Sequence, residues 1–191
     1  MSKVKLGLAL CGSYCTFDKI IPIAKSLSET YDLTIIMSES AANLDSRFGC
    51  AEHFKEILRE MSSKDIICTV DAAEPIGTKG LFDIIAVAPC TGNTISKLTT
   101  GVADSAVTMA VKAHLRNLKP VVIAISSNDA LGANAKNIGE LLNRKHYYFV
   151  PFRQDSPTKK PTSVISDLTL LDETIKHATK NEQIQPILLG V

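Results

Sequence analysis

Short apolar runs rich in β-branched residues alternate with amphipathic stretches from Val4 to Val150, and this alternation restricts the possible folds more than any other feature. Strands of a parallel sheet are buried on both faces, so they are apolar along nearly their whole length. The amphipathic stretches between them are typical of helices that cover the sheet. The pattern therefore predicts an α/β fold with a doubly wound parallel sheet. We expect strands at Lys5–Leu10, Leu33–Met37, Ile66–Val70, Ile84–Ala88, Pro120–Ile125 and Tyr147–Val150.

The composition changes after Pro151. Residues 151–163 are polar and punctuated by proline, which predicts an exposed loop. A closing helix is expected after this loop, because Ile165, Leu168, Leu171 and Ile175 recur at helical spacing. A chain of 191 residues can bury one substantial core, so we expect residues 1–191 to form a single domain.

Composition and charge argue against several classes of function. Lys and Arg total 21 against 20 for Asp and Glu, so the net charge of +1 favours neither nucleic acid nor an anionic membrane as a partner. The apolar run that opens the chain is too short to cross a bilayer. The five cysteines include no CxxC pair, and the four histidines share no metal-ligand spacing. We therefore expect reduced thiols, a cytoplasmic location and no metal.

Ligands of open α/β sheets bind beyond the carboxyl ends of the strands, so the loops there are the first candidates for a site. Gly12 and Ser13 follow the first expected strand, and Ser38 and Ser40 follow the second. Glycine lets backbone approach a ligand closely, and hydroxyls at helix amino termini suit a phosphate. The alternatives are a plain tight turn and a helix cap. Neither GxGxxG nor GKS is present, so the chain has no dinucleotide fingerprint and no P-loop.

Two further loops are unusually polar. Residues 88–97 hold Pro, Gly, Asn and several hydroxyl residues, a composition suited to wrapping a planar polar ring. Residues 126–134 are rich in amide and carboxylate groups, for which an Asx turn with a helix cap is the alternative. The loops at one end of the sheet therefore predict a site for a phosphorylated cofactor.

The segment Pro89-Cys90-Thr91-Gly92-Asn93-Thr94, followed by Lys97 and residues 101–104, resembles the PASANT-type motif of the homo-oligomeric flavin-containing cysteine decarboxylase superfamily. The Gly12-Ser13 turn fits the same superfamily. Within it the chain resembles the family of B subunits of bacterial dipicolinate synthases over nearly its whole length. The matching segments are 46–49, 88–93, 112–117, 127–132, 151–161 and 187–188.

This resemblance implies a flavodoxin-like or Rossmann-like three-layer sandwich, trimer-based homo-oligomers and FMN near a subunit interface. It also implies that the chain helps to make pyridine-2,6-dicarboxylate from a hydroxy-tetrahydrodipicolinate in the mother cell of a sporulating bacterium. The partner would be the A subunit of dipicolinate synthase. Because this chain lacks GxGxxG, the resemblance places NAD(P) on that partner.

Two departures from the superfamily keep other functions open. Its decarboxylases have a catalytic histidine before the strand that leads to the PASANT loop, but residues 71–77 contain none. Their PxMNxxMW motif is replaced by residues 126–132, which keep only the asparagine, Asn128. The alternatives are a stand-alone FMN-dependent decarboxylase or flavin prenyltransferase, and a non-catalytic subunit that stabilises the A chain.

These considerations give two sets of candidate site residues and leave the catalytic residue unassigned. A dianionic substrate in a nearly neutral chain needs local cations, and arginine forms the best fork for a carboxylate. The substrate residues are Arg47, Asn128, Arg153, Lys159 and Lys160. We expect the FMN phosphate near Gly12, Ser13 and Ser38 and its ring near residues 90–94. The cofactor residues are Gly12, Ser13, Ser38, Ser40, Cys90, Thr91, Gly92, Asn93, Thr94 and Asp104.

Overall fold

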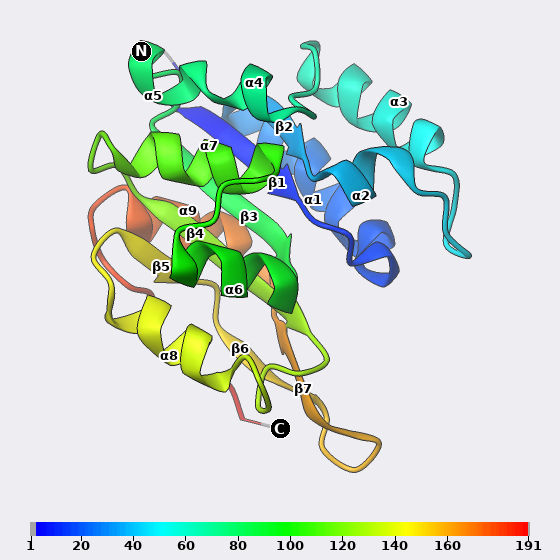
Figure 1. Ribbon diagram of the computed structural model, residues 1–191, viewed down its shortest axis with the longest axis vertical. Helices are drawn as coiled ribbons and strands as arrows, with labels where there is room; N and C mark the ends of the chain where they lie inside the picture. Colours follow the sequence, from blue (N-terminus) through cyan, green and yellow to red (C-terminus); the bar gives the residue numbers. More distant parts are fainter. Residues whose placement is uncertain (1–2, 191) are drawn as a thin grey trace.

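A mostly parallel sheet of seven strands forms the centre of the computed structural model, which describes residues 3–190 (Figure 1). Five strands run parallel in the order β2-β1-β3-β4-β5. Their bounds are β1 Lys5–Leu10, β2 Asp32–Met37, β3 Ile84–Cys90, β4 Val121–Ser127 and β5 Tyr147–Phe149. The fold class predicted from the alternating pattern and five of the six predicted strands are confirmed.

Two layers of helices cover the faces of this sheet (Figure 1). Along β1 the side chain of Leu8 faces one layer and that of Ala9 the other, since successive residues of a strand point to opposite faces. The first layer comprises α1 (Phe17–Thr30), α3 (Ala51–Ser62) and α9 (Leu171–Ala178). The second comprises α4 (Val70–Ala73), α5 (Pro75–Lys79), α6 (Gly92–Thr100), α7 (Ala106–Leu115) and α8 (Ala135–Asn143).

The exposed loop predicted over residues 151–163 is wrong, because this segment forms most of a hairpin. The hairpin strands are β6 (Phe152–Ser156) and β7 (Lys160–Ser166), and β7 pairs antiparallel with the last residues of β4. Phe152 and Val164 are buried, and Phe152 also forms backbone hydrogen bonds with Ile187 and Leu189. These long-range contacts hold a polar segment in strand conformation, and they make the sheet mixed rather than wholly parallel.

Two other predicted elements also differ. The strand predicted at Ile66–Val70 is wrong: only Ile67 bridges β2, at Ile36, and Thr69 then caps α4 by accepting a hydrogen bond from the Ala72 N–H. The closing helix begins later than predicted, since Ile165 lies in β7. Leu168 lies in the short 3-10 helix η2 (Leu168–Leu170), and only Leu171 and Ile175 belong to α9. In both places a local capping residue, Thr69 or Asp167, ends one element and begins another.

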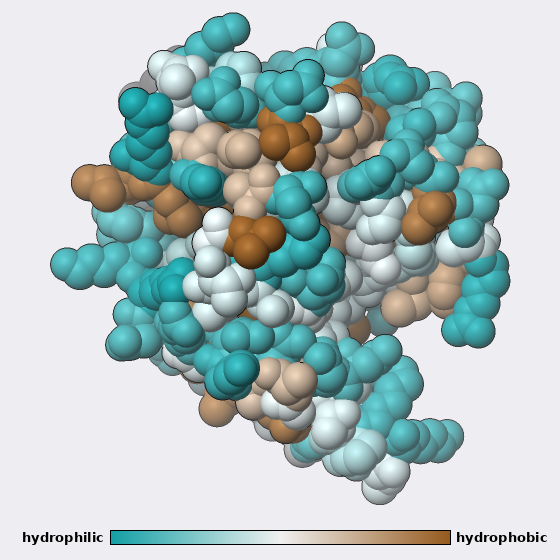
Figure 2. All heavy atoms as spheres, in the orientation of Figure 1, coloured by the Kyte–Doolittle hydropathy of each residue, from teal (hydrophilic) through white to brown (hydrophobic). Residues whose placement is uncertain are grey.

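No helix within residues 3–190 is both long and apolar enough to cross a membrane. The surface in Figure 2 is mainly hydrophilic, with apolar residues scattered over it. Short helices η1 (Tyr14–Thr16) and α2 (Glu39–Asn43) follow β1 and β2 directly, so their amino ends lie at the carboxyl edge of the sheet. This edge is where polar side chains gather.

Candidate functional site

The loops after β1, β2, β3 and β4 meet at the carboxyl edge of the sheet and line two adjoining cavities. The cavities lie beyond the ends of β1 and β3. Here the order of the strands reverses, because β2 pairs with one side of β1 and β3 with the other. Such switch points are where open α/β sheets bind ligands. The large cavity has a volume of about 580 Å³ and the small cavity about 220 Å³. Gly12, Thr91 and Asn93 line both of them.

Five of the eleven residues that line the small cavity carry hydroxyl groups, and the charged residues among them are Glu39, Lys97 and Asp104. Ser38 caps α2 by accepting a hydrogen bond from the Ala41 N–H at 3.3 Å, and its Oγ lies 3.2 Å from that of Ser40. On the opposite wall Lys97 donates to both carboxylate oxygens of Asp104, at 2.9 and 2.8 Å. Seven predicted cofactor residues line this cavity: Gly12, Ser38, Ser40, Thr91, Asn93, Thr94 and Asp104.

Two glycines keep the walls of these cavities open. A Cβ atom on Gly12 would lie 2.9 Å from Oγ of Ser40. A Cβ atom on Gly92 would lie 2.5 Å from Oγ of Ser127, 2.6 Å from Oδ1 of Asp129 and 2.7 Å from Nδ2 of Asn134. Any larger residue would therefore displace polar groups at both positions. Both glycines therefore stand where a Cβ atom would lie closer than 3.0 Å to a polar side chain.

Cys90 is the predicted cofactor residue that the structure places elsewhere. Its side chain is wholly buried in the core beneath the site and lines neither cavity. Burial raises the pKa of the Cys90 thiol well above its usual value, so the thiol stays protonated. The neighbouring Cys11 is also buried, and its Sγ accepts a hydrogen bond from Oγ1 of Thr94 at 3.2 Å. The cysteine pair thus supports the floor of the site.

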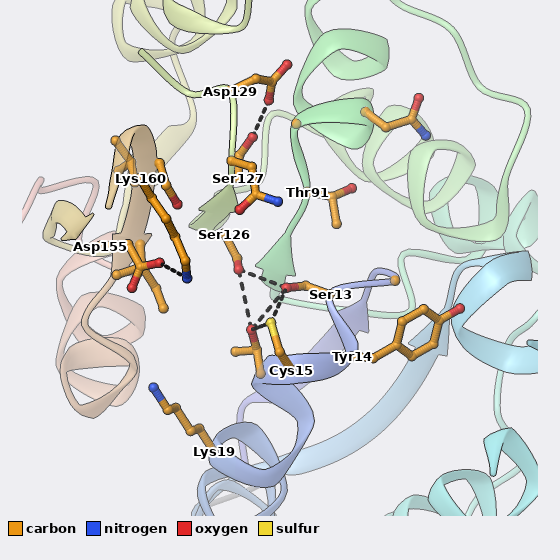
Figure 3. A pocket seen from close by; sticks show the side chains of 18 of the residues that line it. Ser13, Tyr14, Cys15, Lys19, Thr91, Ser126, Ser127, Asp129, Asp155 and Lys160 are labelled. Carbon is orange, nitrogen blue, oxygen red and sulfur yellow. Dashed lines mark hydrogen bonds and ion pairs between the residues drawn. The ribbon is translucent and has the colours of Figure 1, made fainter. Parts of the chain in front are cut away.

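Three hydroxyl groups form a triangle on one wall of the large cavity, shown by dashed lines in Figure 3. Oγ of Ser13 lies 2.8 Å from Oγ of Ser126 and 3.0 Å from Oγ1 of Thr16, and the last two atoms are 3.3 Å apart. Ser13 lines the large cavity and not the small one. The structure therefore separates Ser13 from Ser38, although both are predicted phosphate contacts.

Asp129 anchors a second polar network beside Gly92. Its two carboxylate oxygens accept hydrogen bonds from Oγ of Ser127 at 2.5 Å and from Nδ2 of Asn134 at 2.8 Å. Asn134 in turn accepts from Nδ2 of Asn137 at 2.9 Å. The hydrogen bond from Ser127 holds the pKa of the Asp129 carboxyl below its usual range. The carboxylate is thus ionised and fixed, and it positions Ser127 at the cavity wall.

The β6–β7 hairpin forms the far wall of the large cavity (Figure 3). Nζ of Lys160 donates to Oδ2 of Asp155 at 2.7 Å across the hairpin, and this contact raises the pKa of Lys160. Of the predicted substrate residues, Lys160 and Asn128 line the cavity. The segment predicted as a loop is thus a hairpin, and it places Lys160 at the wall of the large cavity.

The other three predicted substrate residues do not line the large cavity. Arg153 lies 3.7 Å from Asp167 on the surface, and Lys159 lies in the turn between β6 and β7. The Arg47 guanidinium lies over the ring of Phe48, 4.9 Å from its centroid, and it is Phe48 that lines the cavity. Arg47 therefore belongs to the rim of the site rather than to its wall.

Several cavity residues were not among the predicted site residues, and Lys19 is the most informative of them. Lys19 lies in the first turn of α1, three residues after Thr16, and lines the large cavity. Residues three apart on a helix share a face, so the spacing of Lys19 from Thr16, close to the Gly12-Ser13 turn, could have predicted that Lys19 faces the site. Ser126 lies at the end of β4 and Asp129 in the loop after it. This segment is recognisably polar in sequence, but only the structure shows which wall each residue forms.

None of the four histidines lines either cavity. No group of three or more His, Cys, Asp or Glu side chains within residues 3–190 is arranged to hold a metal ion. The ionisable groups that line the large cavity are Lys19, Asp129, Asp155, Lys160, the Tyr14 hydroxyl and the Cys15 thiol.

The residues present fit FMN. The hydroxyls of the small cavity can donate to a phosphate and to ribityl oxygens, and Asn93 on the shared wall offers an amide to a ring edge. At Gly12 and Gly92 the backbone can approach a ligand only because the residue is glycine, since a Cβ atom would crowd neighbouring polar atoms. A cavity of about 580 Å³ lies within the usual size range of small-molecule sites.

Comparison of the sequence with known proteins gives the same family from two sources. The family model described as Flavoprotein matches residues 1–190. The chain is 38% identical to the B subunit of dipicolinate synthase of Bacillus subtilis over 186 residues, which cover 97% of this chain and 93% of that protein.

Solved structures show the same relationship in three dimensions. The B subunit of dipicolinate synthase from Bacillus halodurans superposes with a TM-score of 0.90 at 37% identity, covering 100% of this chain and 99% of the other. The FMN-dependent cysteine decarboxylase SpaF superposes with a TM-score of 0.66 at 18% identity, covering 93% of this chain and 98% of the other, and shows likeness of fold alone.

Proposed function

The chain belongs to the flavoprotein family, and from this premise we propose that it is the B subunit of a dipicolinate synthase with FMN bound in the crevice. The observation that carries the proposal is the identity of 38% to the B subunit of a dipicolinate synthase, which extends over 97% of the chain. The polar crevice at the switch point supports it, because its cavities offer the groups that FMN and a small dianion need.

In this proposal the synthase converts a hydroxy-tetrahydrodipicolinate into pyridine-2,6-dicarboxylate by loss of one water molecule and two hydrogen atoms. FMN, when bound, would supply a hydride acceptor. NAD(P) is assigned to the A subunit, because this chain has no GxGxxG motif. The chain's own residues would bind and orient: Thr91 and Asn93, which line both cavities, would hold the ring, and the polar walls of the large cavity would hold the substrate.

The FMN phosphate is assigned to the small cavity, beside Gly12, Ser38 and Ser40, with the ring extending over Thr91 and Asn93 into the large cavity. Ser40→Asp is expected to raise the dissociation constant of FMN about tenfold or more, because a carboxylate placed there repels the phosphate. Ser40→Asn adds a side chain of the same shape without the charge, so it is the matched control. The quenching of flavin fluorescence on titration measures both.

An equal dissociation constant in the two Ser40 variants would contradict the phosphate assignment. Loss of binding in both would point to steric exclusion, since Oγ of Ser40 is already close to the Gly12 backbone. The third variant Ser38→Ala separates these effects, because it removes a phosphate donor while leaving the volume of the cavity free.

The stand-alone decarboxylase is the weaker alternative, because no histidine lines either cavity. An assay of product formation distinguishes the proposed function from the prenyltransferase and from the silent stabilising subunit. We expect the full chain, mixed with the A subunit of a dipicolinate synthase, to increase the rate at which pyridine-2,6-dicarboxylate forms from the hydroxy-tetrahydrodipicolinate. The reference rate is that of the A subunit without this chain. The chain by itself should release no carbon dioxide from a peptide with a carboxy-terminal cysteine.

Formation of product at the same rate with and without the chain would contradict the proposed function. The silent subunit predicts acceleration that does not depend on the crevice. An Asp129→Asn variant tests this, because it keeps the volume of the side chain while removing the charge that fixes Ser127. Wild-type acceleration by Asp129→Asn would favour the silent subunit.

We expect the chain to assemble as a trimer or a multiple of it. Val102 is 43% exposed in the turn between α6 and α7, beside an apolar groove that Leu98, Val111 and Leu115 line. A neighbouring copy could cover this face. Light scattering during size exclusion should give a trimeric mass for the wild type and a lower mass for Val102→Asp. Val4→Asp is the matched control, because Val4 is 39% exposed before β1. A wild-type monomer at all concentrations would contradict the expectation.

A further inference from the structure

Two lysines from distant parts of the chain line the large cavity beside the hydroxyl triangle of Ser13, Thr16 and Ser126. Lys19 comes from the first turn of α1 and Lys160 from β7. Figure 3 shows the ends of both side chains directed toward the space beside Ser126. Oγ of Ser126 bridges to Ser13 at 2.8 Å, so the triangle joins the loop after β1 to the end of β4.

The charged side chains around this space differ in whether they have a bonding partner. Lys160 is paired with Asp155 at 2.7 Å, and Asp129 accepts hydrogen bonds at both of its oxygens. Lys19 makes no ion pair within the part of the chain that the structure describes. The two lysines and two aspartates that line the cavity balance in charge. Among the described residues, Lys19 is the lysine of this pair whose ammonium group has no carboxylate partner, so it is the charge available to attract an anion.

The hydroxyl triangle supplies the second half of an oxyanion site. A serine or threonine hydroxyl can rotate to donate its proton to a new acceptor. The three hydroxyls now bond mainly to one another, so they can turn toward an anion without losing any contact to the protein backbone. Hydrogen bonds from hydroxyl and ammonium groups to a carboxylate are charge-assisted and stronger than neutral ones.

We infer that Lys19, Lys160 and the hydroxyls of Ser13, Thr16 and Ser126 form the subsite for one carboxylate of the dicarboxylate substrate. This inference rests on the proposed function. Two sources could supply an oxyanion here, a substrate carboxylate or the FMN phosphate. The carboxylate is the one we assign, because the small cavity on the other side of Gly12 takes the phosphate. Lys19 replaces Arg47 and Lys159 as the cation that recognises the substrate.

The test uses the full chain and pyridine-2,6-dicarboxylate itself as the probe, measured by calorimetry in the presence of saturating FMN. Lys19→Gln should raise the dissociation constant of the dicarboxylate about tenfold or more, and Lys160→Gln should raise it at least as much, because it also leaves the Asp155 carboxylate unpaired at the cavity wall. Lys25→Gln is the matched control, since Lys25 is exposed further along α1 and lines neither cavity. Each variant is also titrated with FMN.

A Lys19→Gln variant that binds the dicarboxylate as Lys25→Gln does would overturn the inference. So would a rise in the dissociation constant of FMN alone, which would make the oxyanion the phosphate. The proposed function is judged separately: product formation with the A subunit can fail while Lys19 still controls binding of the dicarboxylate. Conversely, product formation at the wild-type rate by Lys19→Gln would contradict the assignment of this subsite without contradicting the proposed function.

Discussion

Gly92→Ala is expected to lower the free energy of unfolding by about 2 to 3 kcal/mol and to weaken FMN binding at least tenfold. The new methyl group would lie 2.5 to 2.7 Å from polar atoms of Ser127, Asp129 and Asn134. These side chains cannot simply turn away, because they hydrogen-bond to one another in one network. Breaking that network leaves the Asp129 carboxylate without its donors beside the cavity.

Chemical denaturation and FMN titration of the same variant give both numbers. Gly139→Ala is the matched control, because Gly139 lies inside α8 and a Cβ atom there meets nothing within 4 Å. Alanine favours a helix over glycine by up to about 1 kcal/mol, so this variant should be as stable as the wild type or more stable. A Gly92→Ala variant as stable as the wild type, with unchanged affinity for FMN, would show that the network can yield.

The second large effect is a loss of stability in acid that comes from His114. This side chain is 1% exposed on α7, and its Nε2 lies 3.1 Å from the carbonyl oxygen of Pro120, to which it donates as a neutral imidazole. Burial lowers the pKa of His114 to about 4. The unfolded chain binds the proton near its ordinary pKa of about 6.5, so protons favour unfolding between these two values.

Stability contributed by His114 is therefore complete above pH 6.5 and falls by about 3 kcal/mol as the pH decreases to 4. His114→Gln keeps a donor for Pro120 but cannot take up a proton. Denaturant unfolding at several pH values should show a shallower loss for this variant than for the wild type. His53→Gln removes an exposed imidazole and should follow the wild-type curve. Parallel curves for all three proteins would contradict the assignment.

The sheet could be predicted because the information for it is local. Residues such as Leu6, Leu8 and Ile85 are buried in strands that are apolar on both faces, a pattern typical of a parallel sheet. The hairpin could not be predicted in the same way. Residues 153–156 of β6 are polar, and they form a strand because β4 and the carboxy-terminal segment pair with the hairpin. Pairing partners so far apart leave no local signal.

The site could be predicted only as a set of loops. The geometry of a parallel sheet brings Gly12, Ser38 and Thr91 together once the strands are known, and these residues do line adjoining cavities. The direction of each side chain is a different matter. Cys90 precedes Thr91 by one residue but points into the core, and Ser13 faces Ser126 rather than Ser38. Such directions depend on packing that the sequence pattern does not encode.

Arg47 shows the same limit for the substrate. Its charge suggested a carboxylate clamp, but its guanidinium stacks on the ring of Phe48 at the rim. Among the residues that the structure describes, Arg47 forms no ion pair with Asp45 or Glu52. Asp45 accepts the Ala51 N–H at 2.9 Å, and Glu52 pairs with Lys55. The apolar periodicity of α1 does not predict that Lys19 lines the cavity. Its position in the first turn of a helix at this edge of the sheet is the feature that could have predicted it.

The proposed function requires that the crevice hold FMN, and equilibrium titration of the unmodified full chain tests this most directly. The absorbance spectrum and fluorescence of FMN should change on addition of the chain and saturate at one FMN per chain. The dissociation constant should lie in the micromolar range or below, as expected for a ligand anchored by its phosphate in a preformed pocket. A chain that causes no saturable change with FMN at up to about 100 µM would contradict the account.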